Sequence, residues 1–195
     1  MVNLQDRRVK RTQKLIRTSF IELLLKHPIN EITIQMIADR ADINRRTFYL
    51  HYTDIYDLLS QTEDFTLNEF SQLLERFELP SEPQIVGQTF FRWVLSYVQD
   101  NESMLRVLCR NPDSQLMNKL VALTVTHGKR VIPFQQPENA DYILNYCCWG
   151  LIGVLHTALF KPAFDAQQLA LVAEQLLNAS LQVSEIKAYK KAHLK

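Results

Sequence analysis

The chain has 195 residues, of which 47% are hydrophobic and 22% charged, and it contains only three cysteines. This balance is typical of a globular protein and excludes a disordered chain, a fibrous repeat and a secreted domain held by disulfides. The amino end has no apolar stretch of the signal-peptide kind, and the most apolar run, 147–160, is too short for a transmembrane helix. We therefore expect a cytoplasmic protein with no membrane partner.

The net charge of +1 conceals an uneven distribution along the chain. Residues 1–62 carry ten Lys/Arg and seven Asp/Glu, which gives +3, and the remainder carries twelve and fourteen, which gives −2. Between Arg7 and Arg17 there are six basic residues and no acidic one. Such a patch indicates either an end that faces a polyanion or a solvated helix start, and charge alone does not decide between them.

Apolar residues recur at helical spacing along the chain, which predicts an all-α protein of about nine helices. In the amino-terminal part we expect helices at about 9–26, 34–41, 45–50 and 55–77. Beyond a proline-rich break we expect helices at about 84–100, 102–109, 113–131, 138–160 and 166–188. We divide the chain into domains at 1–53 and 54–195, although the break at 80–83 is also a candidate boundary.

The second and third expected helices have the signals of a helix-turn-helix. Thr33 and Asn44 are good N-caps for them, and the turn between them is about four residues long. Ala38 is small enough to let the two helices approach closely, and Ile43 fills the space under the turn. The helix after them begins with a cap of its own, from Asp54 and Asp57.

The third helix presents polar side chains outward from its first turn, as a helix that enters the DNA major groove must. Arg45, Arg46 and Thr47 are the candidates for reading bases, because arginine grips guanine O6 and N7 with two hydrogen bonds. The residues that follow are suited to phosphates, which fix the position of a protein on DNA; they are Tyr49, His51 and Tyr52. The pattern alone also allows ordinary exposed arginines and a packing role for Tyr49.

The segment 33–52 reads TIQMIADRADINRRTFYLHY, and Asp57-Leu58-Leu59 follows it. This order and spacing resemble the signature of the tetracycline-repressor (TetR) family. The specific match covers about residues 9–62, and the rest of the chain resembles the family only in being helical. Asp42 stands where the family usually has glycine, at a position that often needs a positive φ, which Asp tolerates better than most residues. Thr53 and Ile55 stand where lysine is frequent, so one phosphate contact per half-site is expected to be missing.

The resemblance implies a three-helix helix-turn-helix domain that binds a double-stranded DNA operator, and a larger ligand-sensing and dimerisation domain. Further implied DNA contacts are Lys10, Arg11, Thr33 and Asn44. Members are usually homodimers whose last two long helices form a four-helix bundle with the partner. The interface residues implied here are Gly150, Leu151, Gly153, Val154, Ala158, Leu169 and Leu176. The alternative for helix 138–160 is a core helix within one chain.

The family also implies a pocket for a small apolar or aromatic effector. Candidate lining residues are Phe90, Trp93, Tyr97, Met104, Cys109, Met117, Tyr146 and Trp149. Most such residues in proteins are plain core, which remains the alternative for each. Cys147 and Cys148 are expected to be inert and buried, because no basic residue adjoins them. We expect neither a cofactor nor a metal.

We therefore predict a transcriptional regulator, most simply a repressor that binds a palindromic operator as a homodimer and is released by a small molecule. An alternative is an activator, or a regulator that responds to a protein partner rather than a metabolite. An enzyme built on a helical fold is a third interpretation. We do not favour it, because the sequence has no glycine-rich phosphate loop, no serine nucleophile motif and no short-spaced cluster of His, Cys and carboxylates.

Overall fold

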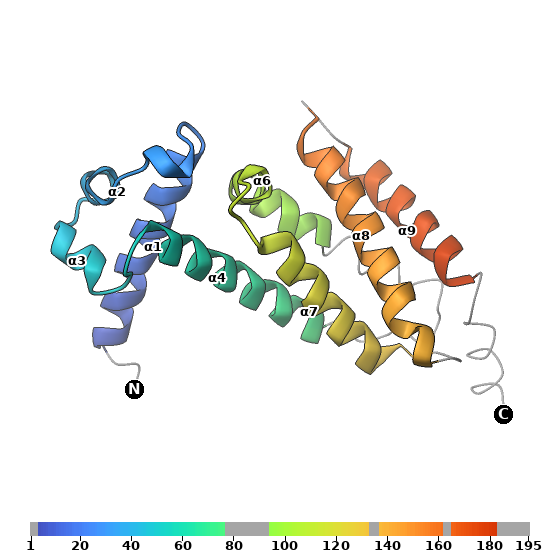
Figure 1. The fold of residues 1–195 in the computed structure, drawn as a ribbon. Coiled ribbons are helices and arrows are strands. Elements are labelled where there is room, and N and C mark those ends of the chain that lie inside the picture. Colours follow the sequence, from blue (N-terminus) through green and yellow to red (C-terminus); the bar gives the residue numbers. More distant parts are fainter. Residues whose placement is uncertain (1–3, 77–93, 133–136, 162–164, 183–195) are drawn as a thin grey trace. The chain divides into compact units, whose positions relative to one another are not determined.

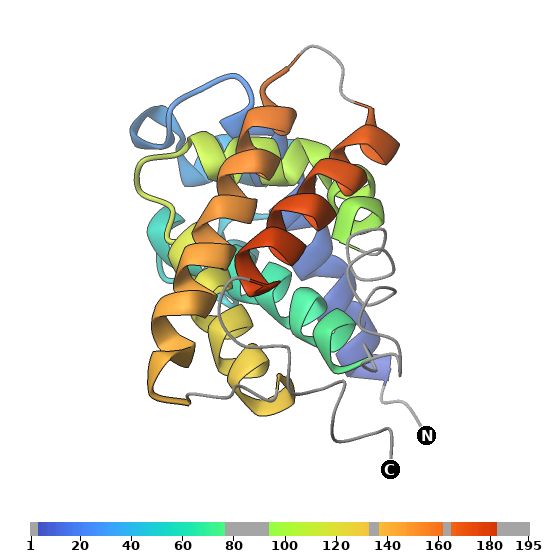
Figure 2. The same cartoon turned by 90° about the vertical axis from the view of Figure 1, so that its right-hand side faces the viewer.

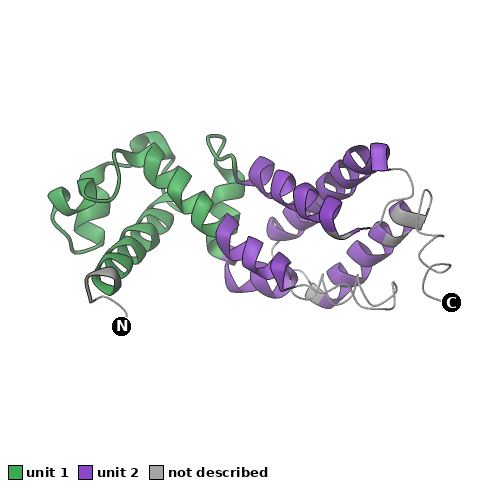
Figure 3. Ribbon diagram, turned by 90° about the horizontal axis from the view of Figure 1, so that it is seen from below, with its two compact units in different colours: residues 1–66, 103–115 green, residues 67–102, 116–195 purple. Residues whose placement is uncertain are grey.

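The computed structural model describes residues 4–76, 94–132, 137–161 and 165–182, and every regular element in these ranges is a helix (Figure 1). The all-α prediction is confirmed in the part of the chain that the structure describes. The chain divides into two compact units, shown in Figure 3. Unit 1 comprises residues 1–66 and 103–115, and unit 2 comprises residues 67–102 and 116–195. The first of the three boundaries along the chain, after Thr66, lies within one continuous helix, whereas the domains expected at 1–53 and 54–195 remain a prediction.

Unit 1 contains the helix-turn-helix and the helices that support it. Its elements are α1 (Leu4–Leu24), η1 (Ile29–Glu31), α2 (Ile34–Arg40), α3 (Arg45–Tyr49), the first part of α4 (Ile55–Glu75), and α6 (Glu102–Arg110). One residue or more from each of the α-helices is fully buried, as expected for a shared apolar core; these include Ile16, Phe20, Ile37, Ala38, Phe48, Leu58 and Leu108. The apolar spacing in the sequence therefore places α2 and α3 on a common core.

Local side-chain caps explain where the short helices begin. The Thr33 hydroxyl accepts a hydrogen bond from the Met36 N–H at 3.2 Å, and the Asn44 side chain accepts one from the Arg46 N–H at 2.8 Å. The carboxylate of Asp54 likewise accepts from the Asp57 N–H at 2.8 Å. These bonds satisfy donors that the first turn of a helix leaves without partners, and they confirm the three predicted caps.

Two helix starts differ from the sequence prediction by three residues or more. α1 begins at Leu4 rather than Val9, because the intervening residues contain no helix breaker. α7 (Leu116–Val131) begins after residue 113, where the helix was expected to start. The cause is a turn at Asn111, whose side-chain oxygen accepts from the Asp113 N–H at 3.1 Å and whose carbonyl accepts from the Ser114 N–H at 3.0 Å.

Unit 2 is a layer of helices in which α7, α8 (Ala140–Leu159) and α9 (Ala166–Gln182) lie side by side (Figures 1 and 2). It also contains the end of α4, a helical segment at 94–100, and the short η2 (Pro137–Asn139). α7 and α8 approach closely at Gly128, where an added Cβ would lie 2.9 Å from Leu144 Cδ2. An ion pair between Lys129 Nζ and Asp141 Oδ2, which lie 2.9 Å apart, joins the same two helices.

By length and composition alone, the helical stretch Pro137–Leu159 is apolar enough to cross a membrane, with a mean hydropathy of 1.3. It extends beyond the run at 147–160 on which the sequence prediction rested. A core helix of a protein without any membrane association passes the same test, so the finding is weak evidence for a span. Only 28% of that window is buried, so much of α8 is exposed in this structure.

Candidate nucleic-acid interface

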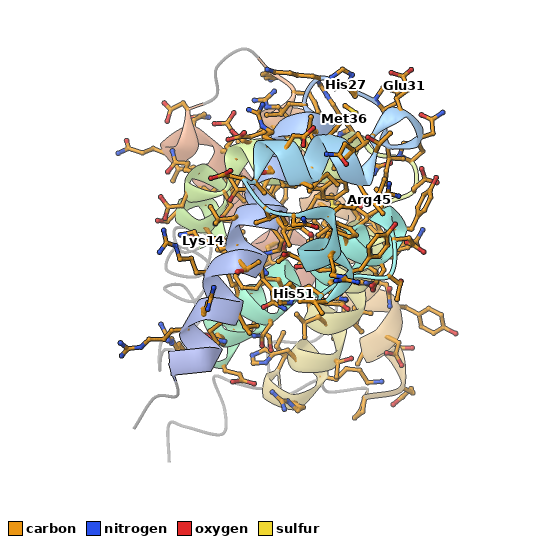
Figure 4. All side chains as sticks on the ribbon, turned by 90° about the vertical axis from the view of Figure 1, so that its left-hand side faces the viewer. Lys14, His27, Glu31, Met36, Arg45 and His51 are labelled. Carbon is orange, nitrogen blue, oxygen red and sulfur yellow. The ribbon has the colours of Figure 1, made fainter. Side chains whose placement is uncertain are left out.

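The basic end of α1 forms one side of the candidate interface. Of the six basic residues there, all but Arg17 are exposed, and Figure 4 shows Lys14 among them. Arg17 is half-buried and lies over the Phe65 ring, with 4.0 Å between its guanidinium carbon and the ring centroid. Arg17 therefore serves packing in unit 1, and the remaining residues, which include Lys10 and Arg11, present positive charge to solvent.

The turn between α2 and α3 has the backbone geometry of a helix-turn-helix. Asp42 has a φ of 51°, the one positive value among the described residues. This is the left-handed conformation expected at a position where the family usually has glycine, and Asp tolerates it better than most residues. The Ile43 N–H then donates to the Ala38 carbonyl at 3.0 Å, and Ala38 is fully buried. The turn therefore survives the change from glycine.

An ion pair fixes α2 on α1. The Arg40 guanidinium donates to the Glu22 carboxylate, which joins the end of α2 to the last turns of α1. Both side chains are substantially exposed, so the pair orients the helices more than it stabilises them. On α2 itself, Gln35 donates to Asp39 at 2.6 Å, one helical turn away.

α3 buries one side and exposes the other. Phe48 is fully buried in unit 1, whereas Arg45, Arg46 and Tyr49 are exposed and Thr47 is half-buried. Figure 4 looks onto the face of unit 1 where Arg45 is labelled. The helix thus presents two guanidinium groups from its first turn, directly after a capped start, as the major groove requires.

The three predicted phosphate residues after the first turn have different surroundings. Tyr49 is 48% exposed and His51 is half-buried on the surface of unit 1 (Figure 4). Tyr52 is only 2% exposed, and its ring packs against Phe48 with 5.5 Å between centroids. Burial raises the pKa of Tyr52, and the neighbouring Arg17 charge partly offsets the rise. The phosphate contact predicted for Tyr52 is therefore corrected, because this ring belongs to the core.

Residues 21–62 match the family model described as bacterial regulatory proteins, tetR family. Residues 21–62 form a TetR-family domain. The matched segment includes the capped α2 and α3, the turn at Asp42 and the first turns of α4. This confirms the family resemblance seen in the sequence.

Solved structures share the fold over most of the chain. A TetR-family regulator from Mesorhizobium loti has a TM-score of 0.67 and 15% identity, with 94% of this chain and 100% of that chain covered. The multidrug-efflux repressor NalD from Pseudomonas aeruginosa has a TM-score of 0.65 and 18% identity, with 91% and 98% covered. The dihydroxyacetone kinase operon activator DhaS has a TM-score of 0.64 and 18% identity, with 89% and 98% covered. No curated protein sequence matches the chain significantly.

The residues predicted from sequence to line an effector pocket are divided between the two units. Phe90 and Trp93 lie outside the described residues, Met104 and Cys109 belong to unit 1, and the half-buried Met117 belongs to unit 2. The Met104 sulfur accepts from the Thr66 hydroxyl at 3.7 Å, and burial raises the pKa of Cys109 to about 11. These two side chains are therefore engaged within unit 1, and the pocket remains a prediction.

Within unit 2, the pocket candidate Tyr97 has a defined polar partner. Its hydroxyl donates to the Glu69 carboxylate at 3.3 Å, and its ring lies 6.1 Å from that of Phe70. Burial, with the nearby Glu69 charge, strongly raises the pKa of this phenol. The last two candidates, Tyr146 and Trp149, are instead 73% and 46% exposed on the surface of α8.

The predicted interface residues of α8 and α9 differ in how far they are exposed. Gly150 and Gly153 are exposed, and a Cβ added at either would meet nothing within 4 Å. Leu176 is also exposed, whereas Ala158 is buried within its own chain. The half-buried members are Leu151, Val154 and Leu169. Sequence reasoning missed Tyr142, which is 78% exposed, although its spacing to Tyr146 and Trp149 puts all three on one helix face.

The two adjacent cysteines are buried, as the sequence predicts. Cys147 and Cys148 are both buried, and burial raises the pKa of each thiol, that of Cys148 to about 11. A thiol with such a pKa remains protonated and unreactive at neutral pH. In the ranges that the structure describes, no cluster of His, Cys and carboxylates has the arrangement of a metal site.

Proposed function

We propose that this TetR-family regulator binds a palindromic DNA operator as a homodimer and acts as a repressor that a small molecule releases. The observation that carries the DNA-binding part is α3, whose capped first turn exposes Arg45 and Arg46. The exposed basic residues of α1 belong to the same compact unit, which supplies the charge that duplex DNA attracts.

Each residue of the interface has a role that follows from its surroundings. Arg45, Arg46 and Thr47 read base edges in the major groove. Tyr49 and His51 contact phosphates, and Lys10 and Arg11 contact the backbone or the adjacent minor groove. The side-chain oxygens of the two N-caps are already used within the protein, so these residues position α2 and α3; they are Thr33 and Asn44.

The dimer proposal rests on the exposed face of α8. Glycine within a helix costs about 1 kcal/mol relative to alanine, and here neither exposed glycine accommodates a neighbour in its own chain. Glycines at such positions allow another helix to approach closely. Tyr142, Tyr146 and Trp149 continue the same side of the helix and leave aromatic surface in water. A second copy of α8 and α9 would cover this face, which also accounts for the low burial of the helix.

The solved structures of similar fold bear on the sign of regulation. NalD is described as a repressor and DhaS as an activator, so this fold serves both signs. We propose that this protein is a repressor with a small apolar or aromatic effector. It acts in the cytoplasm and has no enzymatic activity. The competing function is an activator or a regulator that responds to a protein partner, as DhaS shows that an activator can be built on this fold.

Selection from a library of random duplexes at about 150 mM salt tests the DNA-reading function, because non-specific binding weakens at that ionic strength. We expect the wild-type protein to enrich a palindrome whose half-site centres lie roughly 34 Å, one DNA turn, apart. The matched control is the double variant Arg45→Ala/Arg46→Ala, which should enrich no sequence. If the wild type enriches no more than this control, the proposal is wrong.

A further inference from the structure

The two exposed arginines of α3 differ in how they are held. Arg45 donates from Nη2 to the Tyr49 hydroxyl oxygen at 3.2 Å, and its guanidinium carbon lies 5.7 Å from the Tyr49 ring centroid. Arg46 is held through its backbone N–H, which donates to the Asn44 side chain at 2.8 Å, and no bond from its guanidinium to another described residue is seen. Residues four apart lie on the same face of a helix, which explains why Tyr49 meets Arg45 and not Arg46.

The position of Tyr49 is itself fixed by a contact with the buried core, although about half of this residue is exposed. Its ring meets the ring of Phe48 edge to face, with 5.8 Å between centroids and 89° between planes, and Phe48 is fully buried. The phenol is thus a rigid support that extends from the core of unit 1 to the surface. A chain of contacts therefore runs from the core through Tyr49 to the guanidinium of Arg45.

Holding a long side chain before binding reduces the conformational freedom that binding removes. Arginine has several N–H donors in one plane, so the bond to Tyr49 leaves others to grip guanine O6 and N7. The Tyr49 hydroxyl accepts in this bond, and its own proton remains able to donate to a phosphate. Support of Arg45 and contact with the DNA backbone are therefore compatible in one residue.

We propose that Tyr49 is a positioning residue that holds Arg45 ready for one guanine in each half-site, so that Arg45 carries more sequence discrimination than Arg46. This inference rests on the proposed DNA-binding function. A tyrosine that only contacted a phosphate would contribute equally on every sequence. A tyrosine that positions a base-reading arginine contributes chiefly on the selected one.

The test compares dissociation constants on the selected duplex and on a scrambled duplex of equal length, and takes their ratio as specificity. Tyr49→Phe removes the hydroxyl, which is both the acceptor for Arg45 and the donor to a phosphate. Loss of the phosphate bond weakens binding to both duplexes alike, so a change in the ratio reports on Arg45. We expect the ratio to fall by about 5- to 10-fold, within the range of one lost base contact. Arg45→Ala should lower the ratio further, and adding Tyr49→Phe to it should weaken binding to both duplexes alike without lowering the ratio again. Arg46→Ala should also lower the ratio, but by less than Arg45→Ala does.

Tyr56→Phe is the matched control, because Tyr56 is an exposed tyrosine of the same unit that lies outside α3, and it should leave the ratio unchanged. An equal loss on both duplexes for Tyr49→Phe would overturn the positioning role. The positioning role would also be overturned if Tyr49→Phe lowered the ratio equally in the wild type and in the Arg45→Ala variant. If the wild type prefers no duplex at all, the DNA-reading function fails and this inference fails with it, whereas a wild-type preference that Tyr49→Phe retains overturns only the inference.

Discussion

Asp42 adopts a left-handed φ of 51° at the turn of the helix-turn-helix, a conformation that glycine reaches without a steric penalty. We predict that Asp42→Gly leaves the free energy of unfolding within about 1 kcal/mol of wild type, because relief of strain offsets the greater freedom of the unfolded chain. Asp42→Val should cost about 1–3 kcal/mol, because a β-branched side chain is strained at this φ. Chemical unfolding of the three proteins measures the difference, and equal stability of the valine variant would contradict the assigned turn.

Asp57 gives the molecule a predictable acid sensitivity. Hydrogen bonds from the Gln61 side chain and the Thr53 backbone hold the pKa of Asp57 below its ordinary value. A carboxylate with a lowered folded pKa stabilises the protein above its unfolded pKa, and this contribution is lost as the pH falls through the folded pKa. We expect Asp57→Asn to be less stable than wild type at neutral pH and to lose less stability below about pH 4. Melting curves from neutral to acidic pH test this, and parallel losses in both proteins would contradict it.

At the level of single residues, sequence reasoning succeeded where the cause is local. The caps at Thr33 and Asn44 and the positive φ at Asp42 each depend on a few neighbouring residues. It failed for Tyr52, because α3 is short and the sequence does not show which aromatic after it turns inward. In the structure Tyr52 lies in the core, whereas Tyr49 lies at the surface.

At the level of elements, a buried carboxylate joins α4 to the turn before α7. Glu63 is 2% exposed, and its Oε1 accepts from the Ser114 hydroxyl at 2.7 Å and from the Gln115 N–H at 2.8 Å. The partners are about fifty residues away along the chain, so no local pattern predicts them. The same separation explains why the sequence did not show that residues 103–115 belong to unit 1.

We predict that Glu63→Leu lowers the free energy of unfolding by about 1–3 kcal/mol, because the two donors lose their acceptor in a buried site. Glu63→Gln should cost less, since its amide oxygen can still accept one of these bonds. Urea unfolding of both variants is the measurement. An equal loss in the two would show that the carboxylate does not act as an acceptor for the turn.

At the level of the whole molecule, the all-α architecture and the family of the first unit were predictable from the sequence, because helical spacing and the segment 33–52 are strong signals. The surface of α8 was only partly predictable. Its glycines suggested a close helix approach, but the exposed Tyr142, Tyr146 and Trp149 were not recognised as one face until the packing of α8 on α7 and α9 was known.

This face gives a prediction for assembly. Gly153→Leu adds a side chain where nothing lies within 4 Å in its own chain, so the monomer should fold with equal or greater stability. The added bulk should prevent close approach of a second α8 and weaken dimerisation by at least about 10-fold, a change that corresponds to about 1.4 kcal/mol. Sedimentation equilibrium measures the association, with Ala122→Leu at an exposed site of α7 as the matched control. A dimer that tolerates Gly153→Leu as well as the control would place the interface elsewhere.

The most direct test of the whole account is the stoichiometry and symmetry of the DNA complex. The protein would be bound to the selected duplex, and to the same duplex with one half-site scrambled, and the mass of each complex would be measured by sedimentation. The account predicts two chains on the intact site, with a strong loss of affinity when one half-site is scrambled, because a symmetric dimer needs both. One chain per duplex, with equal affinity for the intact and the half-scrambled site, would contradict a DNA-reading homodimer.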